Sequence, residues 1–283
     1  MDSQDASVTA RLIAAIGSTS MGRCLCALLD GRVGFDMSCL YLFRFDQPAE
    51  LLHNGYGGLI SARTLDAYSR GGYLLDPFYV ASMNRHPGGL WRMTDLAPDS
   101  FFSSGFAISP DIHPCVSSTH GTEIDEIGYI VHLQARAALV FSLMKAQEQG
   151  PFSDAEIAYL QQLTPLIRAA LEQHGRQLPY QVDATDVDSK LESAFVGVLG
   201  QLTEAQRYIA KLLLQGHSNA SIARQLGISE GTVKVHKHNL YQRLEISSHA
   251  ELFRLFIGYI AQAADPAPAR ADAQRDAGDR VPP

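Results

Sequence analysis

Residues 202–260 read LTEAQRYIAKLLLQGHSNASIARQLGISEGTVKVHKHNLYQRLEISSHAELFRLFIGYI, and this stretch decides the fold of the C-terminal part of the chain. It contains several short segments with helical spacing of apolar residues, separated by residues that favour helix starts, helix ends and tight turns. The pattern predicts short helices joined by turns. The punctuating residues are Thr203 (N-cap), Gly216 (helix end), Ser218 or Asn219 (N-cap), Gly227 (tight turn) and Ser229 (N-cap).

Apolar residues at helical spacing predict which faces of these helices point inward. A short helix, a glycine turn and a third helix with a polar outer face are typical of a helix-turn-helix, whose last helix enters the major groove of DNA. A small helical bundle with a solvated basic face is the alternative interpretation. The expected inward residues are Ile209, Ala210, Leu213, Ile222, Ala223, Leu226, Val233, Leu240 and Leu244, and the outward ones are Lys234, Val235, His238 and Gln242.

The distribution of charge supports the DNA-binding interpretation. The whole chain has a net charge of −7, which is unusual for a protein that binds nucleic acid. Residues 196–261, however, contain seven Lys or Arg and four Asp or Glu, together with four histidines, whereas residues 1–178 contain 12 and 18. The positive charge is therefore concentrated in the predicted helix-turn-helix.

The segment resembles the four-helix DNA-binding domain of LuxR/NarL-type bacterial transcription regulators. The resemblance implies that Lys234, Val235 and His238 contact base edges and that Thr232 and Lys237 contact the backbone. The cap Ser229 is a further expected DNA-binding residue. In place of the Arg-Glu pair that the family usually has early in the first helix, this chain has Ala205-Gln206, which removes an ion pair. The matching residues are Leu202, Thr203, Gly216, Ser218, Asn219, Ile222, Ala223, Leu226, Ile228, Ser229, Thr232, Val233, Lys234, His236, Leu244 and Ala250.

The last helix of this segment, expected from His249 to Ala261, is apolar on more than one face. We expect Leu252, Leu255 and Tyr259 to fill the core of the domain, which leaves a second apolar face. Spare apolar surface suggests a homodimer, as in the family, on a near-palindromic operator with half-sites about 10 base pairs apart. RNA polymerase is a further candidate partner. The expected dimerisation residues are Phe253, Phe256 and Ile260.

The N-terminal part mixes helical and strand periodicity. Cys39, Tyr41, Phe43 and Phe45 alternate along a predicted half-buried strand, and Ser153 with Glu156 forms a capping box that starts a long helix containing Pro165. We expect an α+β domain, an antiparallel sheet of about five strands with helices on both faces. The expected strands are 37–45, 50–56, 90–93, 123–133 and 137–145, and the helices lie in 8–29, 61–70, after Pro77 and from Ser153 to His174.

Tyr68, Asp76-Pro77 and Trp91 resemble the core of the acyl-homoserine-lactone-binding domain of quorum-sensing regulators. The resemblance implies that Asp76 accepts a hydrogen bond from a ligand N–H, that Tyr68 donates to a ligand carbonyl, and that Trp91 walls the pocket. A carboxylate inside an aromatic pocket also favours amides or ammonium groups, because a buried charge requires a partner. The complete set of expected ligand-binding residues is Tyr56, Tyr68, Tyr73, Asp76, Trp91 and Ser142.

The sequence does not identify the effector. No Trp lies near Arg63 or Thr64, where the family typically has one, so we expect a small amine- or amide-bearing signal instead of a classical lactone, in a regulator without a partner synthase. A GAF-like description of the domain is equally compatible with the pattern. The alternative function is a DNA-binding regulator whose N-terminal domain mediates protein contacts or dimerisation without a small molecule. The Asp76-Pro77 and Trp91 pattern also has a purely structural interpretation, because Asp-Pro often starts a turn and a single Trp usually lies in the hydrophobic core.

The histidine and cysteine patterns are interpreted as structural. His113, Cys115 and His120 lack the paired spacing of a zinc motif, so we expect no metal and no cofactor. Cys24, Cys26, Cys39 and Cys115 are expected to be reduced thiols. No nucleophile, base and acid pattern indicates an enzyme.

The domain organisation follows from composition. We expect a sensor domain over 1–177, an acidic linker over 178–195, the helix-turn-helix over 196–262 and a disordered tail rich in Ala and Pro over 263–283. No apolar run is long enough to span a membrane, and the start MDSQDASVTA lacks a signal-peptide pattern, so a cytoplasmic protein is expected.

Overall fold

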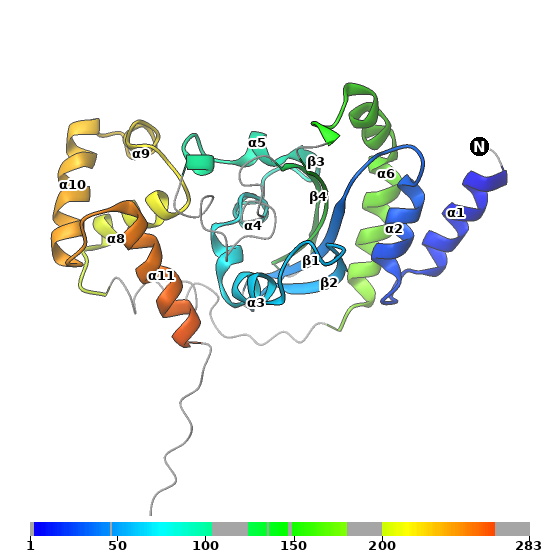
Figure 1. Ribbon diagram of the computed structural model, residues 1–283, viewed down its shortest axis with the longest axis horizontal. Coiled ribbons are helices and arrows are strands. Elements are labelled where there is room, and N and C mark those ends of the chain that lie inside the picture. Colours follow the sequence, from blue (N-terminus) through cyan, green and yellow to red (C-terminus); the bar gives the residue numbers. More distant parts are fainter. Residues whose placement is uncertain are drawn as a thin grey trace, which may run out of the picture.

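A computed structural model describes residues 3–45, 47–103, 124–134, 136–146, 149–179 and 200–263. Its centre is one five-stranded antiparallel sheet with the strand order β2-β1-β5-β4-β3 (Figure 1). The five predicted strands are thereby confirmed. Their bounds are β1 Met37–Arg44, β2 Glu50–Gly55, β3 Gly89–Arg92, β4 Asp125–Leu133 and β5 Ala137–Lys145.

Helices cover both faces of this sheet (Figure 1), which confirms the predicted α-β-α sandwich. On one face lie α1 (Ser3–Ala14), α2 (Met21–Leu29) and α6 (Asp154–Gln177). The other face is covered by short elements, listed here in chain order: α3 (Ala62–Arg70), η1 (Gly72–Leu75), α4 (Pro77–Met83), α5 (Met93–Leu96) and η2 (Phe101–Ser103).

The prediction of a half-buried strand at β1 is wrong. All eight residues of β1 are buried. Cys39, Tyr41 and Phe43 share one face, as expected, and this face lies under α3 and α4. Leu40 and Leu42 on the other face are covered by the α1, α2 and α6 layer. Because β1 pairs with both β2 and β5, it is an inner strand with helices on both sides.

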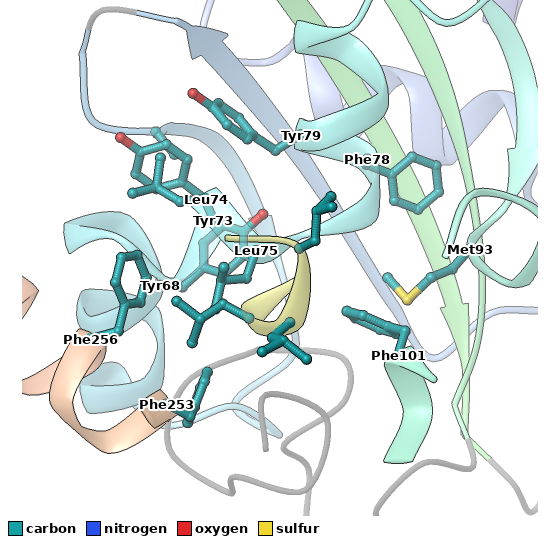
Figure 2. Packing of buried hydrophobic residues seen from close by; sticks show 14 of the residues in the cluster. Tyr68, Tyr73, Leu74, Leu75, Phe78, Tyr79, Met93, Phe101, Phe253 and Phe256 are labelled. Atoms are coloured by element: carbon teal, nitrogen blue, oxygen red, sulfur yellow. The ribbon is translucent and has the colours of Figure 1, made fainter. Parts of the chain in front are cut away.

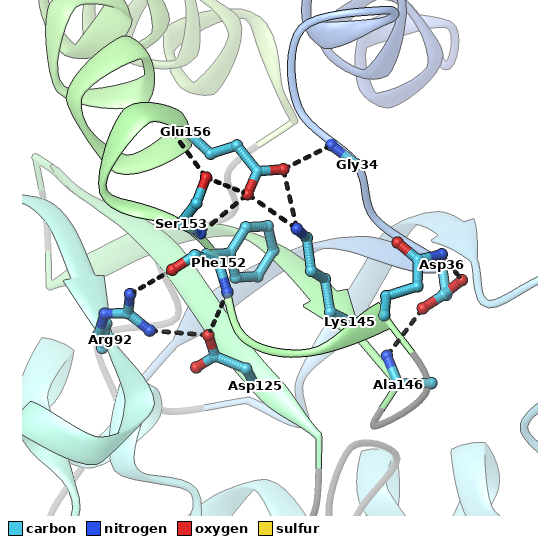
Figure 3. Close-up of polar contacts among 10 residues, drawn as sticks. Gly34, Asp36, Arg92, Asp125, Lys145, Ala146, Phe152, Ser153 and Glu156 are labelled. Carbon is cyan, nitrogen blue, oxygen red and sulfur yellow. Dashed lines mark hydrogen bonds and ion pairs between the residues drawn. The ribbon is translucent and has the colours of Figure 1, made fainter.

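The start of α6 is hydrogen-bonded to Lys145 of β5 and to Gly34, which precedes β1 (Figure 3). Ser153 and Glu156 form the predicted capping box. The Glu156 carboxylate also accepts hydrogen bonds from Lys145 Nζ at 2.8 Å and from the Gly34 N–H at 2.9 Å. Burial opposes ionisation of Glu156, but these hydrogen bonds outweigh it and lower its pKa to about 2.

The C-terminal domain has four helices among the described residues: α8 (Glu204–Leu214), α9 (Asn219–Leu226), α10 (Glu230–Arg243) and α11 (His249–Ala263). The predicted caps are confirmed, and Ser218, not Asn219, starts α9. Gly227 has φ 65°, a left-handed conformation that favours glycine and permits the sharp turn into α10. The predicted inward residues are buried except Leu226, which is partly buried.

Gln206 connects the start of α8 to its surroundings through hydrogen bonds. It is almost fully buried and forms a capping box with Thr203. Its Oε1 also accepts a hydrogen bond from Arg243 Nη1 at 3.3 Å, which links the start of α8 to the end of α10. A neutral amide therefore joins this corner of the bundle, where the sequence predicted that no ion pair would form.

The prediction that α11 leaves Phe253 and Phe256 on an open face is wrong. Their exposed fractions are 3% and 0%, whereas Leu255, expected in the core, is 40% exposed. α11 contacts α3 of the sensor domain, and the two rings belong to the same buried cluster as Tyr68 (Figure 2). The physical reason is that the sensor domain, which sequence periodicity does not take into account, covers this apolar face. The side chain of Ile260 lies outside the described residues.

Several expectations concern parts of the chain that the structure does not describe. They are the linker from residue 180, the tail from 264, and His113, Cys115 and His120. Within the described ranges Cys24, Cys26 and Cys39 are free thiols, as expected. None of the helices described there combines the length and the apolar character that a membrane crossing requires.

Candidate functional site

A small cavity lies between the sheet and the α3 to α4 segment. Its floor comes from strands β1, β4 and β5, and its wall comes from α3 and α4. The open volume is about 10 Å³, roughly the room of one water molecule. The lining residues are Cys39, Tyr41, Phe43, Tyr56, Tyr68, Asp76, Phe78, Glu126, Val140 and Ser142.

Asp76 is the polar centre of the cavity wall and is 4% exposed. It is the N-cap of α4, where its Oδ1 accepts from the Phe78 N–H at 2.7 Å, and Pro77 occupies the first helical turn. Its Oδ2 accepts from the Tyr68 hydroxyl at 2.6 Å. The Asp-Pro pair thus has a structural role as a helix start, and it places a carboxylate in the cavity at the same time.

Tyr68 closes the cavity from the side of α3. Burial, followed by the negative charge of Asp76, raises the pKa of its phenol well above the ordinary value, so the hydroxyl keeps its proton and donates to Asp76. The ring packs against Tyr41, with centroids 5.0 Å apart. A molecule larger than water can occupy this space only if some of the lining side chains move.

Four of the six expected ligand-binding residues line the cavity: Tyr56, Tyr68, Asp76 and Ser142. Trp91 does not line it, because it lies on the edge strand β3, where its Nε1 donates to the Pro87 carbonyl at 2.8 Å and its ring packs on His86. Tyr73 does not line it either. Its ring packs on Tyr79 and its hydroxyl donates to the Gln47 carbonyl at 3.3 Å.

Glu126 is the residue of the cavity that sequence analysis missed. It lies on β4, is 4% exposed, and lines the cavity together with Asp76. The available signal was the alternation along β4, which places Glu126, Gly128 and Ile130 on one face. Gly128 is needed there because a Cβ would lie 2.7 Å from the Phe78 ring.

The second candidate surface is the outer face of α10, which lies on the side of its domain away from the sensor domain (Figure 1). Lys234, Val235 and His238 are exposed, Val235 to 59%. The faces of the helix are fixed by buried Val233 and Leu240, which hold α10 against α8 and α9. These side chains therefore project from a rigid helix into solvent.

The remaining expected DNA contacts lie at the start and on the flank of α10. Ser229 caps the helix by accepting from the Thr232 N–H at 3.0 Å, and the two hydroxyl oxygens are 2.8 Å apart. Lys237 Nζ lies 5.6 Å from the centroid of the Tyr241 ring. Burial raises the pKa of Tyr241 to about 12, so the cation packs over a neutral phenol.

Comparison with known proteins agrees with this two-part architecture. The model of the luxR family of bacterial regulatory proteins matches residues 200–256. An HTH-type transcriptional regulator in the exeN 3′ region of Aeromonas salmonicida is 31% identical over 196 residues, which cover 66% of this chain and 96% of that protein. The nitrate/nitrite response regulator NarL of Escherichia coli K12 is 32% identical over 109 residues, 38% of this chain and 42% of NarL.

The N-terminal domain has its own structural relative. The crystal structure of the VqsR LBD domain from Pseudomonas aeruginosa superposes with a TM-score of 0.51 at 23% sequence identity, over 62% of this chain and 98% of that one. This similarity concerns the fold of the N-terminal domain. Together with the capped helix-turn-helix and the match over nearly the whole length of the Aeromonas regulator, it identifies the chain as a member of the luxR family of bacterial regulatory proteins, a DNA-binding transcription regulator.

Proposed function

We propose that this regulator is controlled by a small-molecule effector that bears an amine or amide and binds in the cavity around Asp76. The observation that carries the proposal is the charge of the cavity. Two of its lining residues, Asp76 and Glu126, are buried acids, and none of the lining residues among the described parts of the chain is basic. A ligand nitrogen that donates hydrogen bonds, or carries a positive charge, complements such a site.

The aromatic lining supports the same ligand class. Tyr41, Tyr56, Tyr68 and Phe78 line the same cavity as the two acids. Such rings favour cationic groups and bury apolar substituents. Because the cavity is small, effector binding must displace lining side chains, and we propose that it separates Tyr68 from Asp76 and thereby changes the packing of α3. The regulatory signal then starts at this cavity.

The experiment is a thermal-shift screen of amines, amides and lactones with the wild type and Asp76→Asn. Asn is also a good N-cap, so α4 should keep its start while the charge is lost. A charged amine should bind Asp76→Asn about 2 to 5 kcal/mol more weakly, and a neutral amide should lose less. Asp66→Asn, the same change at an exposed position of α3, is the matched control and should bind like the wild type.

Glu126→Gln provides an independent test at a residue of the cavity floor, on β4, and should weaken amine binding as well. If amines stabilise Asp76→Asn and Glu126→Gln as strongly as the wild type, the effector does not bind here. The alternative function, an N-terminal domain that mediates protein contacts without a small molecule, would then be favoured.

The proposal includes binding as a homodimer to a near-palindromic operator in the cytoplasm, where bacterial DNA lies. It is supported by the modest positive charge of residues 196–261, because few phosphate contacts give weak binding by one copy. Ser229, Thr232, Lys234, Val235, Lys237 and His238 are the proposed DNA contacts. Binding to a complete site should exceed binding to a single half-site by a large factor, and equal affinities would contradict the dimer.

A further inference from the structure

The N-terminus of α9 is contacted by a sensor-domain segment that follows α5. Asp99 Oδ1 accepts from the Ser218 N–H at 2.9 Å, and its Oδ2 accepts from the Ser218 hydroxyl. The Ser100 N–H donates to the Gly216 carbonyl at 3.0 Å. A Cβ on Gly216 would lie 2.6 Å from Phe101 Cα, so the two backbones are in close contact. Residues 99–101 therefore dock directly on the turn between α8 and α9.

The contact has the chemistry of an anion site. A helix N-terminus offers unsatisfied N–H groups and a positive dipole end, and Ser218 adds a hydroxyl. Partial burial opposes ionisation of Asp99, but the hydrogen bonds from Ser218 and the nearby His217 outweigh it and lower the pKa of the carboxyl. The group that occupies the helix end is thus a stable anion.

The position of α9 in the helix-turn-helix indicates which anion belongs there during function. In this motif the second helix enters the major groove while the first helix crosses the DNA backbone. Helix N-termini are common phosphate ligands in such complexes. Here α10 is the helix with the outward face, so α9 is the helix expected to cross the backbone with its N-terminus near a phosphate.

We propose that the N-terminus of α9, with the Ser218 N–H and hydroxyl as donors, is a binding site for a DNA phosphodiester, and that Asp99 occupies it in place of phosphate when the two domains are docked. DNA and the sensor domain then compete for the same donors. The inference rests on the DNA-binding activity of the chain and not on the proposed effector.

A second contact shows how the docking connects to the effector cavity. Phe253 and Phe256 of α11 pack in one cluster with Tyr68 of α3 (Figure 2). Tyr68 is also the residue whose hydroxyl binds Asp76 in the cavity. A change at the Tyr68 to Asp76 pair therefore acts on the helix that holds α11, whereas α10 stays exposed in the docked arrangement.

The test uses the full chain and fluorescence anisotropy with a labelled random-sequence DNA duplex, without effector. Asp99→Ala should raise the affinity about tenfold, because it removes a charge-assisted hydrogen-bond partner that competes with phosphate. Asp95→Ala is the matched control. It removes the same charge from an exposed position of α5 and should change the affinity less than about twofold, which accounts for long-range charge effects.

Ser218→Ala tests the donors themselves. It should weaken DNA binding, and the gain from Asp99→Ala should shrink in its presence, because both changes act on one contact. Amide hydrogen exchange gives a structural readout. The Ser218 amide should exchange faster in Asp99→Ala than in the wild type, and added duplex should protect it again.

Equal affinities of Asp99→Ala and Asp95→Ala, or an Asp99→Ala gain that is unchanged by Ser218→Ala, would overturn the proposal. If Lys234→Ala weakens duplex binding while Asp99→Ala has no effect, the chain binds DNA but Asp99 does not compete with phosphate. If neither the wild type nor any variant binds the duplex, the chain does not bind DNA under these conditions. Both the proposed phosphate site and the DNA-binding activity on which it rests would then be contradicted.

Discussion

Helices α10 and α11 both carry a face that their own domain does not bury. One of these faces is exposed to solvent, and the other is buried by the N-terminal domain. The spare face of α10 carries Lys234 and His238 and remains in solvent. The spare face of α11 carries Phe253 and Phe256 and is covered by the sensor domain. The difference shows that a polar face can remain exposed to solvent and available to DNA, whereas an apolar face packs against another part of the chain.

The largest expected effect is on the covered face. Phe256→Ala should lower the free energy of unfolding by about 3 to 5 kcal/mol, because it removes a fully buried ring and leaves a cavity. Leu255→Ala, on the same helix but 40% exposed, should cost less than about 1 kcal/mol. Urea unfolding of both variants makes the comparison, and similar costs would mean that Phe256 is not buried in solution.

Glu156 lies on the opposite side of the sheet from α11, and its charge should make the free energy of unfolding depend on pH. Its pKa of about 2 lies below the ordinary value of 4.5, so the carboxylate stabilises the fold above pH 4.5, and this contribution is lost as the pH falls towards 2. Glu156→Gln should therefore cost about 2 kcal/mol at pH 7, and little near pH 2. Unfolding measured across this pH range checks it, and a cost independent of pH would contradict the role of the charge.

A smaller effect is expected on the open face of α10. Lys234→Ala should lower operator affinity by about 1 to 3 kcal/mol and relax the preference at one base pair, because it removes the base-edge contact that we propose. The free energy of unfolding should stay the same, since the side chain is exposed. Selection of bound sequences from a random pool measures the preference. Equal losses on operator and random DNA would show that Lys234 holds only the backbone.

Lys237→Ala should give the smallest change. We expect uniformly weaker binding to all sequences and a salt dependence that is flatter by about one unit, as for the loss of one phosphate contact. Lys237 Nζ lies 5.6 Å from the centroid of the Tyr241 ring, on the flank of α10. Titrations at several salt concentrations test the slope, and an unchanged slope would remove Lys237 from the phosphate contacts.

The parts of the fold that depend on neighbouring residues could be predicted from the sequence. Ser153, Ser218, Gly227 and Ser229 act within a few residues of their own position, and all four have the expected local role. The alternation of strands and the position of α6 follow from the same short-range patterns. These features required no knowledge of what packs against them.

The parts that depend on distant segments could not be predicted in full. Trp91 lies near Asp76 in sequence, but the edge position of β3 keeps it out of the cavity. Glu126 comes into the cavity only because β4 pairs with β5 in a particular register. Phe253 and Phe256 looked exposed because the surface that covers them belongs to another domain.

The contrast between α10 and α11 can be measured directly by thiol labelling of the full chain, with Val235→Cys and Phe253→Cys compared and the native thiols resolved by peptide mass spectrometry. We predict that Val235→Cys reacts rapidly and is protected by duplex DNA. Phe253→Cys should react about a hundredfold more slowly, because labelling requires the domains to separate or the helix to open. Equal and rapid labelling at both positions would contradict the account, since it would mean that the sensor domain does not cover α11.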